Sequence, residues 1–221
     1  MKKSILALIF GAMAIGAQAG TVSFNYGSSI PLSATEINQT GNLGLFDSNL
    51  GTLTGAFLTV NGQASYSITG RNTASSSQTA AITGFTSIFW DSSISALDAF
   101  LLGSMNLNAG SGFQTYSPNQ LSTFGPLSDS DSLSDDLGAI LTSLQAAGGG
   151  SFSLACNSRS GTVVQGGGGL IAANVDSQAG CGAEIIYTFE ERVSQVPEPG
   201  SLALVGLALA GVAGASRRRK S

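Results

Sequence analysis

Apolar and polar residues alternate along several short segments of this chain, and that period of two constrains its fold more than any other feature. The clearest segments place apolar side chains at alternate positions: Val22, Phe24 and Tyr26; Ala64, Tyr66 and Ile68; Ala183, Ile185, Tyr187 and Phe189. Such alternation is typical of β-strands with one buried face. Glycine accounts for 30 of the 221 residues and charged residues for only 10%, which favours turns and strands over long surface helices. The sequence therefore predicts an all-β fold, an antiparallel β-sandwich of the jelly-roll or immunoglobulin-like kind.

A β-hairpin is predicted at Asn61-Gly62. One strand-like segment begins at Leu50 and ends at this dipeptide, and a second, residues 63–69, follows directly. Asn and Gly both tolerate positive φ, which a two-residue hairpin turn requires. Residues 79–90 indicate a further, more buried strand.

One segment has helical spacing instead. Its apolar residues recur every three or four positions: Leu133, Leu137, Ile140, Leu141 and Leu144. Ser134 is a suitable N-cap, Asp135 and Asp136 would lie in the first turn, and Gly148 would end the helix. We therefore expect one short helix over residues 135–147. The Gly-rich stretches 148–150 and 166–169 are expected to be loops, and neither has the Lys-Ser/Thr of a phosphate-binding loop.

The N-terminus has the three parts of a secretory signal peptide. Lys2 and Lys3 precede a short apolar stretch, and Ala17 and Ala19 are small residues at the positions that signal peptidase inspects. We expect residues 1–19 to form a signal helix that is removed by cleavage before Gly20. An N-terminal membrane anchor that is never cut is the alternative.

The two cysteines, Cys156 and Cys181, both fall in the part of the chain expected to be exported. An even number of cysteines outside the cytosol indicates a disulfide. Closing a loop of that length would stabilise the fold by about 3 kcal/mol on the chain-entropy model. Two free buried thiols are the alternative. A zinc site is not expected, because two thiolates without a histidine do not complete a usual zinc shell.

The C-terminus combines three features in order. Pro197, Glu198 and Pro199 come first, an uncharged segment over residues 200–216 follows, and Arg217, Arg218, Arg219 and Lys220 come last. As a helix the uncharged segment would extend about 25 Å, short of a bilayer core of about 30 Å. The cations would hold its far end in the cytoplasm. This arrangement resembles the PEP-CTERM sorting signal of Gram-negative bacteria; an ordinary C-terminal membrane helix is the alternative.

That resemblance implies a route through the cell. The chain would pass through the inner membrane transiently on its C-terminal transmembrane helix, and an exosortase would remove the tail in a host that makes extracellular polysaccharide. Three regions follow: a signal peptide over residues 1–19, an exported domain over residues 20–192 and a sorting tail over residues 193–221. Residues 190–196 would tether the domain to the tail. The implied partners are signal peptidase, the exosortase and extracellular polysaccharide.

Part of the exported region resembles the choice-of-anchor E domain. The resemblance is carried by Phe46, by Leu-Gly-Thr-Leu-Thr at residues 50–54 and by the strand-like segments after them. The acidic run 127–136 and the final aromatic segment 184–191 fit its layout, so that it covers about residues 22–192. It implies an exported domain with no established catalytic residues.

The charge distribution excludes several functions. Residues 20–192 hold twelve acids, three arginines and no lysine, and the chain has no histidine. Duplex nucleic acid would be repelled, because its binding relies on cations that neutralise phosphates. The Ser-His and Cys-His nucleophile pairs and a catalytic Schiff-base lysine in the domain are excluded, and no cofactor is expected.

Carboxylate chemistry, as in glycoside hydrolysis, is the enzymatic alternative that remains. Its candidates are Asp91, Asp98, Asp129, Asp131, Asp135, Asp136, Glu184, Glu190 and Glu191. We expect these acids to be solvated surface groups of a protein that is not an enzyme.

Two binding sites are weaker hypotheses. Asp129 and Asp131 are weak candidate Ca²⁺ ligands, because the run does not match an EF-hand loop. Turns at Asp129 and Asp131, and a helix N-terminus at Asp135 and Asp136, are the favoured explanation of its acids. Trp90 is a candidate platform for stacking against a sugar ring, and Tyr26 and Tyr116 are weaker candidates. A place in the hydrophobic core is the alternative. The sequence thus favours an exported structural or adhesive protein of the cell surface or extracellular matrix, with a carbohydrate-binding module as the alternative.

Overall fold

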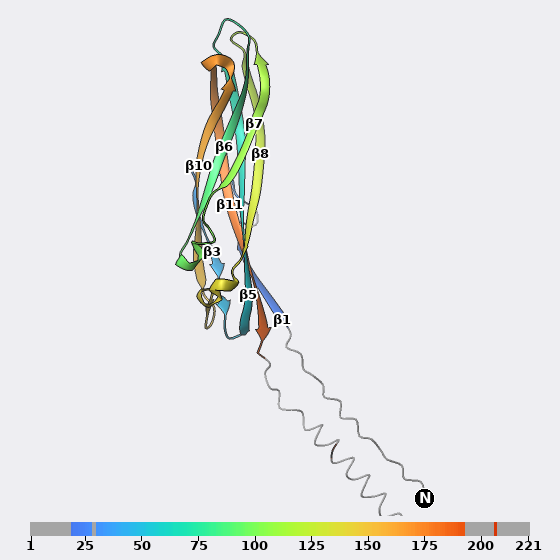
Figure 1. Ribbon diagram of the computed structural model, residues 1–221, viewed down its shortest axis with the longest axis vertical. Helices are drawn as coiled ribbons and strands as arrows, with labels where there is room; N and C mark the ends of the chain where they lie inside the picture. The colour runs from blue at the N-terminus through green and yellow to red at the C-terminus, as the bar shows by residue number, and fades with distance from the viewer. Residues whose placement is uncertain (1–18, 28–29, 193–205, 207–221) are drawn as a thin grey trace, which may run out of the picture. The chain divides into compact units, whose positions relative to one another are not determined.

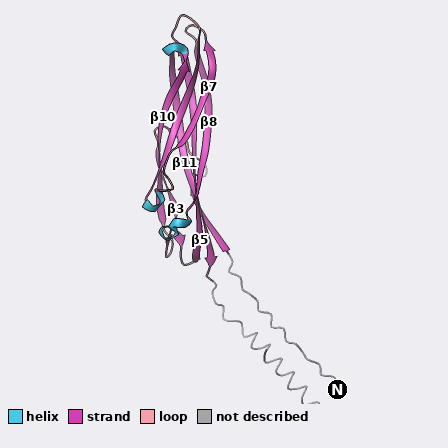
Figure 2. Ribbon diagram, viewed as in Figure 1, coloured by secondary structure: helices cyan, strands magenta, loops and turns pink. Residues whose placement is uncertain are grey.

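A computed structural model describes residues 19–27, 30–192 and 206 of the chain. Contacts group residues 18–191 into one compact unit, which contains all of the described strands (Figure 1). Most of its residues lie in strands, and the two large sheets are antiparallel (Figure 2). The prediction of a mostly β, antiparallel fold is confirmed.

Two sheets form the unit, a five-stranded and a four-stranded one. The five-stranded sheet has the order β1 (Ala19–Tyr26), β11 (Ile171–Glu191), β5 (Gly51–Asn72) and β8 (Leu121–Asp136), and the short β2 (Ser33–Ala34) also pairs with β11. The four-stranded sheet has the order β3 (Asn38–Gly44), β10 (Ser151–Gly166), β6 (Gln78–Ser92) and β7 (Met105–Tyr116). A small parallel pair joins β4 (Phe46–Asp47) to β9 (Gln145–Ala146).

The hydrophobic core lies between the two sheets, because alternate residues of each long strand point inward. Along β5 these include Leu58, Val60, Tyr66 and Ile68, all nearly or fully buried. Each fully buried aliphatic side chain of this size contributes about 1.5–3 kcal/mol. The Tyr66 hydroxyl crosses the core and donates a 2.9 Å hydrogen bond to the carbonyl of Leu107 in β7. Buried tyrosines thus connect the sheets as well as fill the space between them.

The predicted hairpin at Asn61-Gly62 is wrong. Strand β5 runs without a break from Gly51 to Asn72, so that the dipeptide lies in its middle. Gly62 points inward, where an added Cβ would lie 2.5 Å from Met105 Sδ and 2.7 Å from Ile88 Cδ1. The glycine is therefore explained by the close approach of side chains from the opposite sheet and not by a turn. The strands predicted at residues 21–26, 63–69, 79–90 and 183–190 are confirmed.

The helix predicted over residues 135–147 is also wrong. Strand β8 continues to Asp136, and only a 3-10 helix, η2 (Gly138–Ser143), follows it. Leu137 and Leu144 are fully buried on either side of η2, and Ile140 within it departs from helical geometry. A compact 3-10 turn is enough to bury two leucines that are seven residues apart. Tertiary contacts therefore override the preference for an α-helix that the spacing indicates. Two further 3-10 helices, η1 (Ser95–Leu97) and η3 (Gly167–Gly169), lie at other chain turns.

The acidic run 129–136 lies in the edge strand β8, not in the predicted turns or at a helix start. Asp129 and Asp131 pair with Ala64 and Gly62, two inward-facing positions of β5. The Asp129 carboxylate accepts a 2.8 Å hydrogen bond from the backbone N–H of Asn108 in β7. Acids on the inner side of an edge strand hinder pairing with another chain.

The predicted disulfide is confirmed. Cys156 of β10 is bonded to Cys181 of β11, and both side chains are buried. Because the two strands belong to different sheets, the bond links the sheets through the core.

Residues 190 and 191 complete β11 instead of starting a tether. The signal helix, the C-terminal helix and the basic cluster fall outside the described residues. Among the residues that are described, no helix has both the length and the apolarity needed to cross a bilayer.

Candidate functional site

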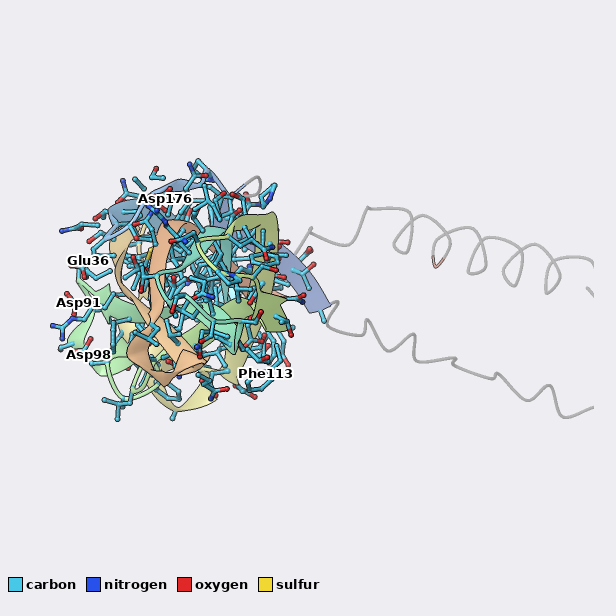
Figure 3. The ribbon with its side chains drawn as sticks, turned by 90° about the horizontal axis from the view of Figure 1, so that it is seen from above. Glu36, Asp91, Asp98, Phe113 and Asp176 are labelled. Carbon is cyan, nitrogen blue, oxygen red and sulfur yellow. A yellow bond between two sulfur atoms is a disulfide. The ribbon has the colours of Figure 1, made fainter. Side chains whose placement is uncertain are left out.

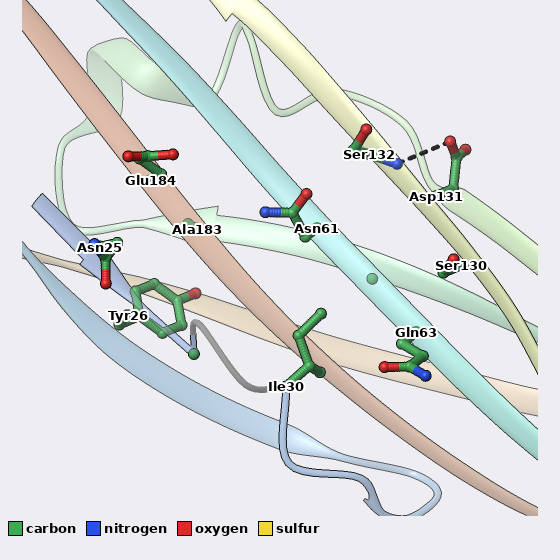
Figure 4. Close-up of a pocket in the computed structure, with 12 residues that line it drawn as sticks. Asn25, Tyr26, Ile30, Asn61, Gln63, Ser130, Asp131, Ser132, Ala183 and Glu184 are labelled. Atoms are coloured by element: carbon green, nitrogen blue, oxygen red, sulfur yellow. Dashed lines mark hydrogen bonds between the residues drawn. The ribbon is translucent and has the colours of Figure 1, made fainter. Parts of the chain in front are cut away.

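A shallow polar hollow of about 690 Å³ lies on the outer face of the five-stranded sheet (Figure 4). We call it the polar basin. Its lining comes from β1, β5, β8, β11 and the chain after β1: Asn25, Tyr26, Gly27, Ile30, Asn61, Gly62, Gln63, Ser130, Asp131, Ser132, Ala183 and Glu184.

Two glycines of β11 shape one side of the basin. An added Cβ at Gly182 would lie 2.6 Å from the Gly27 carbonyl oxygen, and one at Gly180 would lie 2.5 Å from Ile30 Cγ2. Gly27 and Ile30, which follow β1, therefore lie directly over the backbone of β11. They form a wall that rises from the sheet beside the exposed side chains of β5.

Strand register places the polar side chains of the floor. Asn61 lies between Ser132 of β8 and Gly182 of β11, and Gln63 lies opposite Ser130. Asn61 and Gln63 are half-buried and point outward, because they alternate along β5 with buried residues. Two amides and two hydroxyls thus lie side by side on one face.

These polar groups have no partner within the described chain. The side chains in question are Asn25, Asn61, Gln63, Ser130, Ser132 and Glu184, and none makes a hydrogen bond or ion pair with a described residue. In contrast, the carboxylate of Asp131 accepts a 2.8 Å hydrogen bond from the N–H of Ser132. The basin therefore offers amide donors and acceptors, hydroxyls and a carboxylate to a ligand.

The nine candidate catalytic acids are divided between the two sheets. Asp91 and Asp98 belong to the part of the chain around the four-stranded sheet, whereas the others lie on β8 or β11. Figure 3 shows Asp91, Asp98 and Asp176 on the outside of the unit. Glu184 and Asp131 are brought into the basin. Within residues 19–27 and 30–192, no three His, Cys, Asp or Glu residues are grouped so as to hold a metal ion.

The aromatic residues predicted as sugar platforms lie in or against the core. Trp90 is only 9% exposed and Tyr116 is fully buried. The ring of Tyr26 packs over Gly41 of β3, and its hydroxyl donates a 3.4 Å hydrogen bond to the Leu154 carbonyl. Burial raises the pKa of Tyr26 above its ordinary value. None of the three presents an open ring face.

Exposed aromatic rings occur on the outer face of the four-stranded sheet instead. Phe85, Phe89 and Phe113 are 39%, 38% and 65% exposed. The Arg159 guanidinium lies 5.8 Å from the centre of the Phe89 ring, within the range of a cation–π contact. Phe85 covers Gly161 of the neighbouring strand. The sequence reasoning missed both this face and the basin, although Asn61, Gln63, Ser130 and Ser132 are alternate polar residues that mark an outward face.

The two ends of the β unit lie together. Ala19, at the start of β1, pairs with Glu190, near the end of β11 (Figure 1). The segment that would precede the cleavage before Gly20 and the segment that leads into the tail therefore join the same end of adjacent strands.

Comparison with known proteins identifies the tail. The model of the PEP-CTERM protein-sorting motif matches residues 195–220, nearly all of which lie outside the described residues. No curated protein matches the chain. Among solved structures, the coat protein of Tobacco streak virus is similar at 12% identity, over 85% of this chain and 96% of that one, with a TM-score of 0.23. An infectious bursal disease virus particle protein is similar at 7% identity, over 91% and 50%, with a TM-score of 0.20.

The sorting motif indicates that the chain is an exported protein handled by an exosortase. It indicates passage through a membrane-anchored intermediate and sorting to the cell surface of a Gram-negative bacterium.

Proposed function

We propose that this chain is a non-enzymatic structural or adhesive protein of the cell surface or extracellular matrix, built on a choice-of-anchor E type domain. The observation that carries the proposal is the sorting motif at residues 195–220. A protein sent to the surface as an anchored intermediate has to present a stable, self-contained body there. The unit of residues 18–191 meets this requirement.

The chemistry of the unit supports a passive role. The sheets are linked by the buried disulfide Cys156–Cys181, which limits opening of the core. The outer face of the five-stranded sheet displays hydroxyl and amide side chains on β5 and β8 with few charges. Such a surface interacts with hydrated polymers through many weak hydrogen bonds and few ionic contacts.

The test is the fate of the full chain in a host that has an exosortase. We expect surface or matrix protein whose intact mass shows cleavage before Gly20 and loss of the sorting tail. A chain in which Pro197, Glu198 and Pro199 are replaced by alanine should stay in the membrane fraction with its tail. Full-length protein in the cytoplasm with reduced thiols would refute the proposal.

A carbohydrate-binding module is a second candidate, favoured by the unpartnered polar groups of the basin. Its site would be the basin, because Trp90 is buried. A glycosidase that uses carboxylates is a remote alternative. Release of reducing sugar that is abolished by Glu184→Gln would support it, and no release from a broad set of polysaccharides would refute it.

A further inference from the structure

We propose that the polar basin binds an uncharged polysaccharide through its sugar hydroxyls. The proposal rests on the surface or matrix location proposed above, where such polymers are met. It assigns the binding to Asn61 and Gln63 of β5, flanked by Ser130 and Ser132 of β8 and by Glu184 of β11.

The basin presents a set of unused hydrogen-bonding groups. Each amide of Asn61 and Gln63 offers two donor hydrogens and an acceptor oxygen, and each serine hydroxyl is both donor and acceptor. Sugar hydroxyls are likewise donors and acceptors, so neighbouring hydroxyls of one ring match neighbouring amides in one row. A ligand with apolar or acceptor-only groups would leave half of the lining unpaired.

The charge of the basin is negative. Glu184 faces the basin from β11, Asp131 adds a second acid beside it on β8, and no lining residue is a cation. Arg71 and Arg192 lie eight residues along the chain from Gln63 and Glu184, which is about 27 Å at about 3.4 Å per residue. At physiological salt this is several Debye lengths. Phosphates, sulfates and uronic acids would meet uncompensated negative charge, so the geometry selects uncharged sugars.

The shape of the basin suits an extended polymer. The floor is kept low by Gly182, and one wall is formed by the chain at Gly27 and Ile30. Beyond the basin, the same outward face continues with Thr59 and Ser134 at one end and with Ser65 and Ser128 at the other. The Thr59 and Ser134 hydroxyls form a 3.0 Å hydrogen bond with each other, whereas the amides of Asn61 and Gln63 have no hydrogen-bond partner among the described residues. The polar row lets a polymer extend past the site in both directions.

The lining has no exposed aromatic ring, so a single site should bind weakly. Many copies of the protein on one surface would still hold a repetitive polymer. Once one site is occupied, the neighbouring sites meet the same polymer at a high effective concentration, which raises the overall avidity. This matches an adhesive role better than capture of a soluble sugar.

The experiment uses the processed protein with its disulfide intact. Neutral oligosaccharides of glucose, galactose and mannose, each six units long, are titrated into ¹⁵N-labelled protein, beside an oligogalacturonate of equal length. We expect at least one neutral oligomer to shift the side-chain amide signals of Asn61 and Gln63 in a saturable way. The acidic oligomer should not.

Two variants sharpen the test. Replacing Asn61 and Gln63 together by alanine should weaken binding about tenfold, because the hydrogen bonds of both amides are lost. Ser67→Ala with Thr69→Ala is the matched control, because these residues point outward from the same strand beyond the basin. The control should bind like the unmodified protein, and both variants should keep the original thermal midpoint.

Three outcomes would overturn the proposal. They are no saturable shift with any neutral oligomer, equal binding by the alanine double variant, and preference for the oligogalacturonate. If the protein is sorted to the surface but shows no saturable shift in this titration, only the assignment of sugar binding to the basin is refuted. A chain that binds but is never exported would refute the proposed location instead.

Discussion

Cys156 and Cys181 join the two sheets at a place where both side chains are buried in the core. The bond joins residues 25 positions apart in the sequence. Its loss therefore raises the conformational entropy of the unfolded chain. Replacing both cysteines by alanine should lower the free energy of unfolding by about 2–4 kcal/mol.

Urea denaturation of the purified protein measures this change. The unmodified protein should lose a similar amount of stability in a thiol reductant, whereas the double variant should not respond to the reductant. Equal midpoints for the double variant and for the unmodified protein without reductant would contradict the assigned role of the bond.

Gly62→Ala should destabilise the protein by about 1–3 kcal/mol, because the added methyl group meets Met105 and Ile88 in a filled core. Gly55→Ala in the same strand is the matched control, since its added Cβ would meet only Thr188 Cβ at 3.8 Å. Thermal unfolding of both variants checks this. A Gly62 variant as stable as the Gly55 variant would show that the strand does not pack as described.

Tyr187→Phe should cost about 0.5–1.5 kcal/mol at neutral pH, because the hydroxyl donates a 2.9 Å hydrogen bond to the Gly44 carbonyl. Burial raises the pKa of Tyr187 above its ordinary value of 10.0. Above pH 10 the unfolded chain therefore loses this proton while the folded chain keeps it, so stability falls as pH rises. Urea unfolding at pH 8 and at pH 10.5 should show a smaller alkaline loss in the variant than in the unmodified protein.

Replacing Asp129 and Asp131 by valine should promote association along the β8 edge, because these acids sit on the inner side of an exposed strand. The matched control replaces Ser128 and Ser130 by valine, which adds the same apolar groups on the outward face. Light scattering against protein concentration separates the two. Monomers throughout, or equal association in both variants, would refute a protective role for the acids.

The sequence predicted the parts of the fold that depend on local alternation. Residues 183–190 and 63–69 each place one face in the core, and that period is visible in the sequence. Gly62 was misinterpreted because an inward glycine under Met105 and a turn glycine look alike without the opposite sheet. The spacing of Leu137 and Leu144 suits a helix, but both are buried through a short 3-10 turn.

The basin could not be predicted because its parts are far apart in sequence. Asn61, Ser132 and Glu184 meet only through the register of three strands. Gly180 and Gly182 leave room for the chain segment that forms the wall of the basin. In a chain with 30 glycines, nothing in the sequence distinguishes these two from ordinary loop glycines. The prediction that aromatic residues such as Trp90 form a sugar platform was wrong for a related reason. The neighbouring sequence does not distinguish a buried tryptophan from an exposed one.

If the chain is cut before Gly20 as predicted, the pairing of Ala19 with Glu190 also sets an order of events. Gly20 lies opposite Phe189, whose ring covers it closely. A peptidase that cuts between Ala19 and Gly20 has to take that bond into its own groove as an extended, unpaired strand. Once β1 has docked, the bond is held in the ladder, so the predicted removal of residues 1–19 would have to come before β1 pairs with β11. Because β1 pairs with β11, the last strand of the unit in chain order, the predicted cleavage site would stay unpaired until β11 has been made.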